Sequence, residues 1–442
     1  MNQQPTILII FGVSGDLSKR YLLPAIGQIA KAGMMPSEFK IVGVTRKDSV
    51  DVDSLLEKTA NKKYLNLNTE IYPMNAGDIA DYQKLGEFLE KVEKGFSSKA
   101  QRLFYLSTPP LVAKSIVEFL GESGLAKVPD TKLLLEKPFG TNLESAVDLA
   151  KHVDQYFDAL QVYRIDHYLA KENAQNVIVF RDGNSLFKKT WNKDFIESIE
   201  VVASEEVGVA GRGNFYEQTG ALRDVVQSHL LQLAALVLMD LPKDSKDVPN
   251  ARREALRQMH IVCDVNNKEC ITRGQYEGYR EEVGNRDSMV ETFISLKVSS
   301  SDPKWLGVPV TLSTGKALKE RKTEIRVCYK KEAENESNEL LLRIQPDAGI
   351  EFSMWAKKPG LEHQVSRHKL HFHFKEHYES LPEAYEQVLY NAINGDHNLF
   401  ASSEEVVETW RILDVVQQAF AKNKDDLVIY PKGSSVEEVL KM

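Results

Sequence analysis

The sequence predicts an α/β protein with two domains. Residues 1–165 are expected to form a doubly wound parallel sheet, and residues 166–442 an α+β domain with a large, mostly antiparallel sheet. Three observations support this organisation. The chain has 442 residues, which is too long for one ordinary hydrophobic core. Short apolar runs alternate with helical patterns in the first part, as in βα units. Alternating apolar and polar residues dominate the later part, as in antiparallel strands.

The chain opens with a predicted strand, turn and helix. Residues 7–11 are a continuous apolar run that suits a strand buried on both faces, and residues 19–31 have the apolar spacing of a helix. Glycines in the turn would let backbone N–H groups approach a pyrophosphate at the helix N-terminus, so the unit predicts a Rossmann-type dinucleotide-binding domain. The spacing is GxxGxxS rather than GxGxxG, and an ordinary β–α turn remains the alternative. The candidate cofactor-binding residues of this turn are Gly12, Ser14, Gly15, Asp16 and Leu17.

Two further cofactor candidates follow predicted strands. Arg46 comes directly after the strand expected at residues 40–45. An Asp or Glu at this position suits the ribose 2′-hydroxyl of NAD, whereas Arg suits the 2′-phosphate of NADP. Lys137 follows the strand expected at residues 133–135, where an ammonium can meet a phosphate. The alternatives are a solvated loop arginine and a Lys–Pro turn without a role.

The segment Tyr163–Glu172 carries charge at high density. Asp166, His167, Tyr168 and Lys171 lie within it, and such a run is poor core material because charged groups are rarely buried without partners. It suits a site, since His and Lys can hold a phosphate dianion and Asp can orient an imidazole elsewhere in the chain. A solvated turn between two domains is the alternative.

The second half supplies a histidine on a predicted helix. The strand expected at residues 195–205 delivers Glu205, and residues 221–232 form a helical pattern with Asp224 and His229. At 3.6 residues per turn these two residues are displaced by about 140°, which predicts that they serve different parts of a pocket. Lys316 and Arg321 are cations that could close a pocket on an anionic ligand, or form a solvated basic face.

Composition excludes several classes of protein. The formal net charge is −8, which favours neither nucleic acid nor an anionic membrane as a partner. The three cysteines contain no CxxC pair and cannot all pair within one chain, so we expect a reducing compartment and no structural zinc. No signal peptide is recognisable, and no apolar stretch is expected to approach the ~20 residues of a membrane helix. The protein is therefore predicted to be cytoplasmic.

Several strings resemble the glucose-6-phosphate dehydrogenase family over nearly the whole chain. Residues 164–172, RIDHYLAKE, are similar to its RIDHYLGKE signature, with Ala170 in place of Gly. The family's GxxGDLxKR, EKPFG and GKxLxERK strings are also present. RDVVQSHLLQ resembles RDxxQNHLLQ, with Ser228 in place of Asn. Residues 343–346, RIQP, resemble RxQP, which adds Gln345 to the candidates.

The resemblance implies oxidation of D-glucose 6-phosphate at C1 with reduction of NADP, the entry reaction of the oxidative pentose phosphate pathway. It implies that His229 is the base, that Asp166 orients it, and that no metal takes part. Homodimers or homotetramers are expected by analogy. The alternatives are a related sugar or sugar-phosphate dehydrogenase and a non-catalytic NADP-binding sensor. The residues implied in substrate binding are His167, Tyr168 and Lys171 at the 6-phosphate, Glu205 and Asp224 at sugar hydroxyls, and Lys316, Arg321 and Gln345 around them.

Overall fold

The computed structural model describes residues 4–47, 50–209, 211–262, 270–331, 337–423 and 426–442. These residues form two compact units that are not continuous in sequence. Unit 1 comprises Met1–Ala170 and Pro382–Val406, and unit 2 comprises Lys171–Leu381 and Val407–Met442. Helix α14 (Ser403–Lys422) begins in unit 1 and continues in unit 2.

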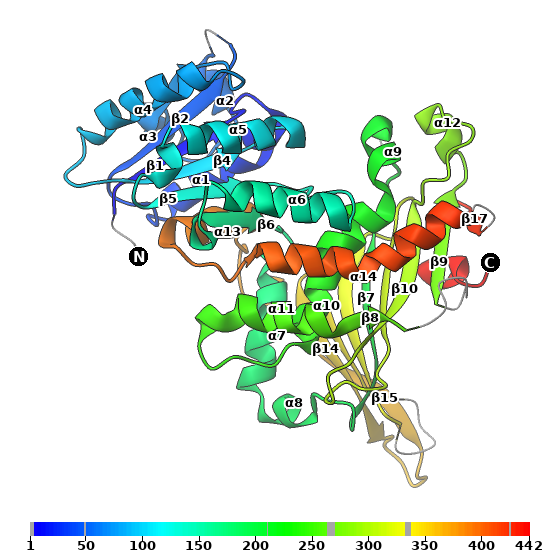
Figure 1. Cartoon of the computed structure of the whole chain (residues 1–442). Helices are drawn as coiled ribbons and strands as arrows, with labels where there is room; N and C mark the ends of the chain where they lie inside the picture. The colour runs from blue at the N-terminus through cyan, green and yellow to red at the C-terminus, as the bar shows by residue number, and fades with distance from the viewer. Residues whose placement is uncertain (1–3, 48–49, 210, 263–269, 332–336, 424–425) are drawn as a thin grey trace. The chain divides into compact units, whose positions relative to one another are not determined.

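Unit 1 is a doubly wound α/β sheet (Figure 1). The strand order is β16-β6-β5-β4-β1-β2-β3, in which β1 to β6 are parallel and β16 is antiparallel to β6. The order 3-2-1-4-5-6 of the parallel strands is that of dinucleotide-binding sheets. Its elements are β1 (Thr6–Phe11), η1 (Ser18–Leu22), α1 (Leu23–Lys31), β2 (Phe39–Thr45), α2 (Val52–Leu55), α3 (Lys62–Asn68), β3 (Thr69–Pro73), α4 (Ile79–Glu93), β4 (Gln101–Leu106), α5 (Pro110–Glu122), η2 (Leu125–Lys127), β5 (Thr131–Leu135), α6 (Leu143–Asp154), η3 (Ala159–Gln161), β6 (Val162–Ile165), α13 (Ala384–Asn394) and β16 (Phe400–Ala401).

Both faces of this sheet are covered by helices. Leu8 and Ile10 of β1 lie in one hydrophobic cluster with α1 and α13. On the other face the ring of Phe11 stacks on Tyr82 of α4, with 6.1 Å between the ring centroids. Because each central strand is buried on both sides, its residues are apolar without alternation, as the sequence of β1 requires.

Unit 2 is built on a ten-stranded, mostly antiparallel sheet. Nine strands follow the order β15-β14-β13-β12-β7-β11-β10-β9-β17, and β8 pairs with β10. Only the β7–β11 and β9–β17 pairs are parallel in the part of the chain that the structure describes. The predicted fold class is therefore confirmed. The elements of unit 2 are α7 (Glu172–Gly183), α8 (Ser185–Thr190), β7 (Ile196–Ser204), α9 (Gly213–Ala221), η4 (Leu222–Leu230), α10 (Leu231–Leu238), η5 (Ser245–Asp247), α11 (Val248–Gln258), β8 (Met259–Ile261), β9 (Ile271–Tyr276), α12 (Tyr279–Val283), β10 (Phe293–Ser300), β11 (Val310–Gly315), β12 (Lys322–Tyr329), β13 (Glu339–Gln345), β14 (Gly349–Lys357), β15 (Val365–His373), η6 (Phe374–Glu376), β17 (Leu427–Tyr430) and α15 (Val436–Val439).

One helical run in unit 2, Gly213–Leu238, has the length and apolar composition of a membrane helix. The expectation that no apolar stretch approaches this length is wrong here. Of its most apolar 18-residue window, 89% is buried inside the protein, as in the core helix of a globular unit. The run comprises α9, η4 and α10, and it carries Asp224 and His229.

Three buried side chains fix the C-terminal end of this run. Arg181 donates hydrogen bonds to the carbonyl oxygens of Leu236 (2.6 Å) and Met239 (2.7 Å). The indole N–H groups of Trp191 and Trp305 donate to the carbonyls of residues 237 and 238, at 2.8 and 2.7 Å. The last carbonyls of a helix have no partner within it, so these donors satisfy groups that burial would otherwise leave unpaired.

The cysteines differ from the expectation. Cys328 is a free, half-buried thiol, whereas Cys270 is disulfide-bonded. The absence of a CxxC pair and the odd cysteine count did not anticipate this bond. The third cysteine, Cys263, lies outside the described residues.

Candidate functional site

The turn after β1 is tightly built around Gly12. Its φ is +83°, and a Cβ at this position would lie 2.4 Å from the Ser107 carbonyl oxygen, so only glycine fits. The Gly12 N–H bonds the Val44 carbonyl at 3.0 Å, and the Gly12 carbonyl accepts from the N–H of Gly15 (2.9 Å) and the hydroxyl of Ser18 (3.1 Å). This close-packed turn before a helix fits the pyrophosphate of a dinucleotide.

The other candidate residues of this turn follow Gly12 in the chain and differ in their exposure. Ser14 is half-buried, and Leu17 packs against the hydrophobic core of unit 1. Asp16 is exposed and pairs with Arg20 of the following π-helical turn at 2.7 Å. Arg46 is exposed directly after the carboxyl end of β2. In dinucleotide-binding sheets of this strand order, a residue near this position can bind the adenosine ribose.

A half-buried carboxylate that the sequence did not single out, Glu136, follows β5. Glu136 accepts a hydrogen bond from the Tyr105 hydroxyl and is hydrogen-bonded to Tyr385. Burial raises its pKa from the ordinary 4.5 to about 7, against the lowering effect of the two hydroxyls and Lys137; nearby Asp166 adds to the rise. Lys137, the predicted candidate, is half-buried beside it. The EKPFG string was the only sequence signal for Glu136, and Tyr385 gave none.

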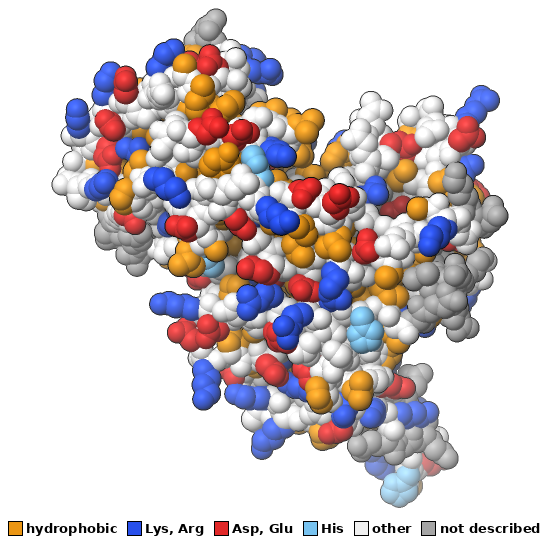
Figure 2. Space-filling model, in the orientation of Figure 1, with side chains coloured by type: hydrophobic (Ala, Val, Ile, Leu, Met, Phe, Trp, Pro, Cys, Tyr) orange, Lys and Arg blue, Asp and Glu red, His pale blue; other side chains and the backbone are white. Residues whose placement is uncertain are grey.

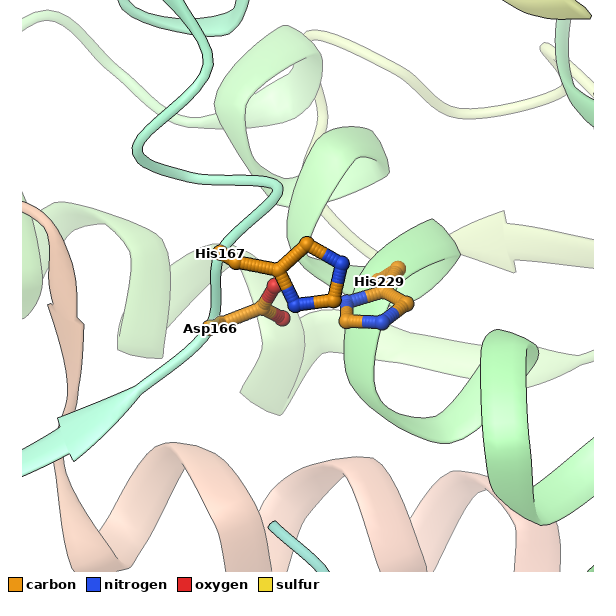
Figure 3. Close-up of side chains that lie close together, drawn as sticks. All are labelled: Asp166, His167 and His229. Atoms are coloured by element: carbon orange, nitrogen blue, oxygen red, sulfur yellow. The ribbon is translucent and has the colours of Figure 1, made fainter. Parts of the chain in front are cut away.

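Asp166, His167 and Tyr168 follow the end of β6. Figure 3 shows the first two side chains directly beyond the β6 arrow. The buried Asp166 carboxylate accepts a hydrogen bond from the Tyr168 N–H at 2.9 Å. The His167 ring stacks on Tyr385, with centroids 6.5 Å apart and planes 10° apart. Unit 1 thus fixes these groups on the carboxyl edge of its sheet, where ligands of such sheets bind.

The candidates of unit 2 begin with Lys171, the N-cap residue of α7. His229 is buried on η4, and Figure 3 shows its imidazole projecting from this turn of helix. Asp224 lies half-buried five residues earlier.

Segment η4 is π-helical, which changes the geometry expected for Asp224 and His229. A π-helix bonds the N–H of residue i+5 to the carbonyl of residue i, so residues five apart come round to the same side of the helix. The displacement of about 140° was therefore wrong, because it assumed an α-helix. The two side chains share one side of the helical run, and π-helical turns are frequent at functional sites.

Four candidates lie at one end of the large sheet. Gln345 ends β13, Arg321 precedes β12, Glu205 follows β7 and Lys316 follows β11, and these four strands are neighbours in this order. The buried Lys316 ammonium pairs with Glu205 at 2.8 Å and lies 5.3 Å from the centroid of the Tyr216 ring.

Gln345 and Arg321 differ in their surroundings. Gln345 is half-buried and donates to the hydroxyl of Thr323 at 3.3 Å. The side chain of Arg321 is exposed, and its backbone N–H bonds Glu206 at 3.3 Å. The sheet therefore brings a cation, a carboxylate and an amide together, which suits a polar, anionic ligand. Basic and acidic side chains are interspersed on the face shown in Figure 2.

A dinucleotide-binding sheet together with a second unit that presents imidazole, carboxylate and ammonium groups defines a nicotinamide-dependent oxidoreductase. Two family models match the chain. "Glucose-6-phosphate dehydrogenase, NAD binding domain" matches residues 9–176, and "Glucose-6-phosphate dehydrogenase, C-terminal domain" matches residues 178–441. The chain belongs to the glucose-6-phosphate dehydrogenase family, and the resemblance found in the sequence is confirmed.

Individual relatives agree. Glucose-6-phosphate 1-dehydrogenase of Chlamydia muridarum is 34% identical, with 97% of this chain and 93% of the relative covered. The enzyme of the same name from Bacillus subtilis is 33% identical, with 98% and 95% covered. A solved glucose-6-phosphate dehydrogenase in complex with its substrate glucose-6-phosphate has a TM-score of 0.91 at 30% identity, covering 100% of this chain and 98% of its own. Gal80p from Saccharomyces cerevisiae, with a TM-score of 0.57 at 12% identity over 95% of this chain and 96% of its own, shares the fold alone.

Proposed function

We propose that this protein oxidises D-glucose 6-phosphate at C1 to 6-phospho-D-glucono-1,5-lactone and reduces NADP to NADPH. One observation carries the proposal: the family match spans both the dinucleotide-binding half and the half that bears His229. A sensor that only binds a nucleotide has no need of a base, whereas the chain keeps His229 and Asp166 in their family strings.

His229 is the general base of the proposed mechanism. Its imidazole accepts the proton of the sugar 1-hydroxyl as C1 is oxidised; a bound nicotinamide would accept the hydride from C1. In this mechanism Asp166 would accept a hydrogen bond from the other imidazole nitrogen, which would set the tautomer and stabilise the imidazolium. The chemistry of the two groups and the family strings support this pairing. Asp166 belongs to unit 1 and His229 to unit 2.

The sugar phosphate is bound by charge and by hydrogen bonds. We assign the 6-phosphate to His167, Tyr168 and Lys171, because an imidazole, a phenol and an ammonium suit a dianion. Glu205 and Asp224 accept hydrogen bonds from sugar hydroxyls. Lys316, Arg321 and Gln345 complete the proposed substrate-binding set.

NADP is the proposed cofactor because Arg46 stands where an acidic residue would select NAD. The turn formed by Gly12, Ser14, Gly15, Asp16 and Leu17 would hold the pyrophosphate, and Lys137 would lie between nicotinamide and substrate. The proposed reaction requires no metal. We also propose a cytoplasmic homodimer or homotetramer, by analogy with the family.

A substrate panel tests the proposal. The purified protein is given glucose 6-phosphate, glucose or another sugar phosphate, each with NADP or NAD, and formation of reduced nicotinamide is followed by its absorbance. We expect turnover with glucose 6-phosphate and NADP to exceed all other combinations. Preference for another sugar would indicate a related dehydrogenase, and nucleotide binding without turnover would indicate a sensor.

A further inference from the structure

A buried carboxylate in unit 2 forms the N-terminal anchor of the segment that carries His229. Glu291 lies two residues before the start of β10 and is only 8% exposed. Its Oε1 atom accepts a hydrogen bond from the Leu222 N–H at 3.0 Å, and its backbone carbonyl accepts from the Ala221 N–H at 3.0 Å. Both donors lie where η4 begins, so Glu291 satisfies helix N–H groups that have no partner within the helix.

The backbone at Gly220 leaves room for the Glu291 side chain. Gly220 has φ +65° and ψ 175°, which kinks the helical run inside α9, two residues before η4 begins. A Cβ at Gly220 would lie 2.4 Å from Oε1 of Glu291, so any larger residue would displace the carboxylate. A glycine inside a helical run and a buried carboxylate each cost stability. Their contact here therefore indicates that the Glu291 side chain has a defined role at this position.

The neighbouring residue connects the same anchor to Lys316. The carbonyl of Thr292 accepts the Lys316 N–H at 2.9 Å. The Tyr430 hydroxyl donates to the Lys316 carbonyl at 2.7 Å and meets the Thr292 hydroxyl at 3.0 Å. Lys316 in turn pairs with Glu205. Two adjacent residues therefore join the start of η4 to the Lys316–Glu205 pair.

We propose that Glu291 is a positioning residue that sets His229 and Asp224 against the Lys316–Glu205 pair. This inference rests on the proposed function of His229. The other end of the helical run is fixed independently by Arg181, Trp191 and Trp305. Loss of the Glu291 anchor therefore shifts η4 without releasing the whole run.

Two conservative variants separate the effect of side-chain length at residue 291 from the effect of its charge. Glu291→Asp keeps the charge but shortens the side chain, so its oxygen no longer reaches the Leu222 N–H. Glu291→Gln keeps the side-chain length and an acceptor oxygen but loses the charge. We expect kcat to fall about 10- to 100-fold in Glu291→Asp, because displacements of about 1 Å cost that much, and to stay within a few-fold of wild type in Glu291→Gln. Gly220→Ala should reproduce the loss, and Glu281→Ala, an exposed carboxylate of α12, serves as the control.

The measurements distinguish positioning from general loss of structure. NADP affinity should not change, because its candidate residues belong to unit 1, and circular dichroism should report a folded protein. The His229 resonances of isotope-labelled protein should move in Glu291→Asp and not in Glu291→Gln. Wild-type kcat and an unmoved His229 in Glu291→Asp, or a loss confined to Glu291→Gln, would overturn the proposal. Absence of wild-type turnover would refute the proposed function instead, and the His229 resonances would still test the anchor.

Discussion

The pKa of Glu136 predicts a pH-dependent stability that one substitution removes. Burial raises this pKa from 4.5 to about 7, so the folded state holds a proton that the unfolded state has released. A raised carboxyl pKa stabilises the fold below the unfolded value and loses that contribution as pH rises through the folded value. Between about pH 5 and about pH 8 the loss is about 2.5 kcal/mol, at 1.36 kcal/mol per pKa unit. For a unit of this size that corresponds to about 5–10 °C in Tm.

The assay compares the Tm of wild type with that of Glu136→Gln across this pH range. The amide is neutral throughout and can still accept the Tyr105 hydrogen bond, so its effect on packing is the same at every pH. We expect the Tm of wild type relative to the variant to fall by about 5–10 °C from about pH 5 to about pH 8. Glu144→Gln, an exposed carboxylate on α6, should show no such trend. A constant difference for Glu136→Gln would refute the reasoning, because Glu136 would then not titrate in this range.

Three further predictions concern the proposed reaction. Arg46→Ala should raise the KM for NADP and leave the KM for NAD nearly unchanged, because a charge-assisted contact worth about 1.5–3 kcal/mol is lost. Equal losses with both cofactors would show that Arg46 does not bind the 2′-phosphate. Lys171→Ala should weaken glucose 6-phosphate strongly and unphosphorylated glucose little, as a panel of KM values would show; equal effects would place Lys171 elsewhere. His229→Asn should lower kcat by at least about 10²–10⁴-fold while calorimetry still detects binding of glucose 6-phosphate, and Asp166→Asn should lower kcat less. Near-normal turnover in His229→Asn would mean that another residue is the base, and His167 would be the first candidate.

The apolar runs predicted the central strands well. The expected strands at residues 40–45 and 133–135 lie within β2 and β5. Strands buried on both faces must be apolar at every position, so the pattern is visible without knowledge of the partners.

Features that depend on distant contacts were not predictable from local patterns. An amphipathic pattern shows which face of residues 385–394 is apolar, but not that this helix covers the sheet of unit 1 and brings Tyr385 to Glu136. The π-helical register of η4 has no periodicity of its own in so short a segment, so Asp224 and His229 were placed on an α-helix. Glu291 lacked any motif because its role arises from the kink at Gly220.

The return of residues 382–406 to unit 1 has a consequence for synthesis on the ribosome. Strand β6 lacks its neighbour β16, and the face that includes Leu8 and Ile10 lacks α13, until nearly the whole chain has been made. At roughly 5–20 residues per second, the interval between residue 170 and residue 406 is about 12–50 s. Throughout that time the nascent nucleotide-binding half exposes an open strand edge and an uncovered apolar surface, the features that chaperones recognise and that promote aggregation.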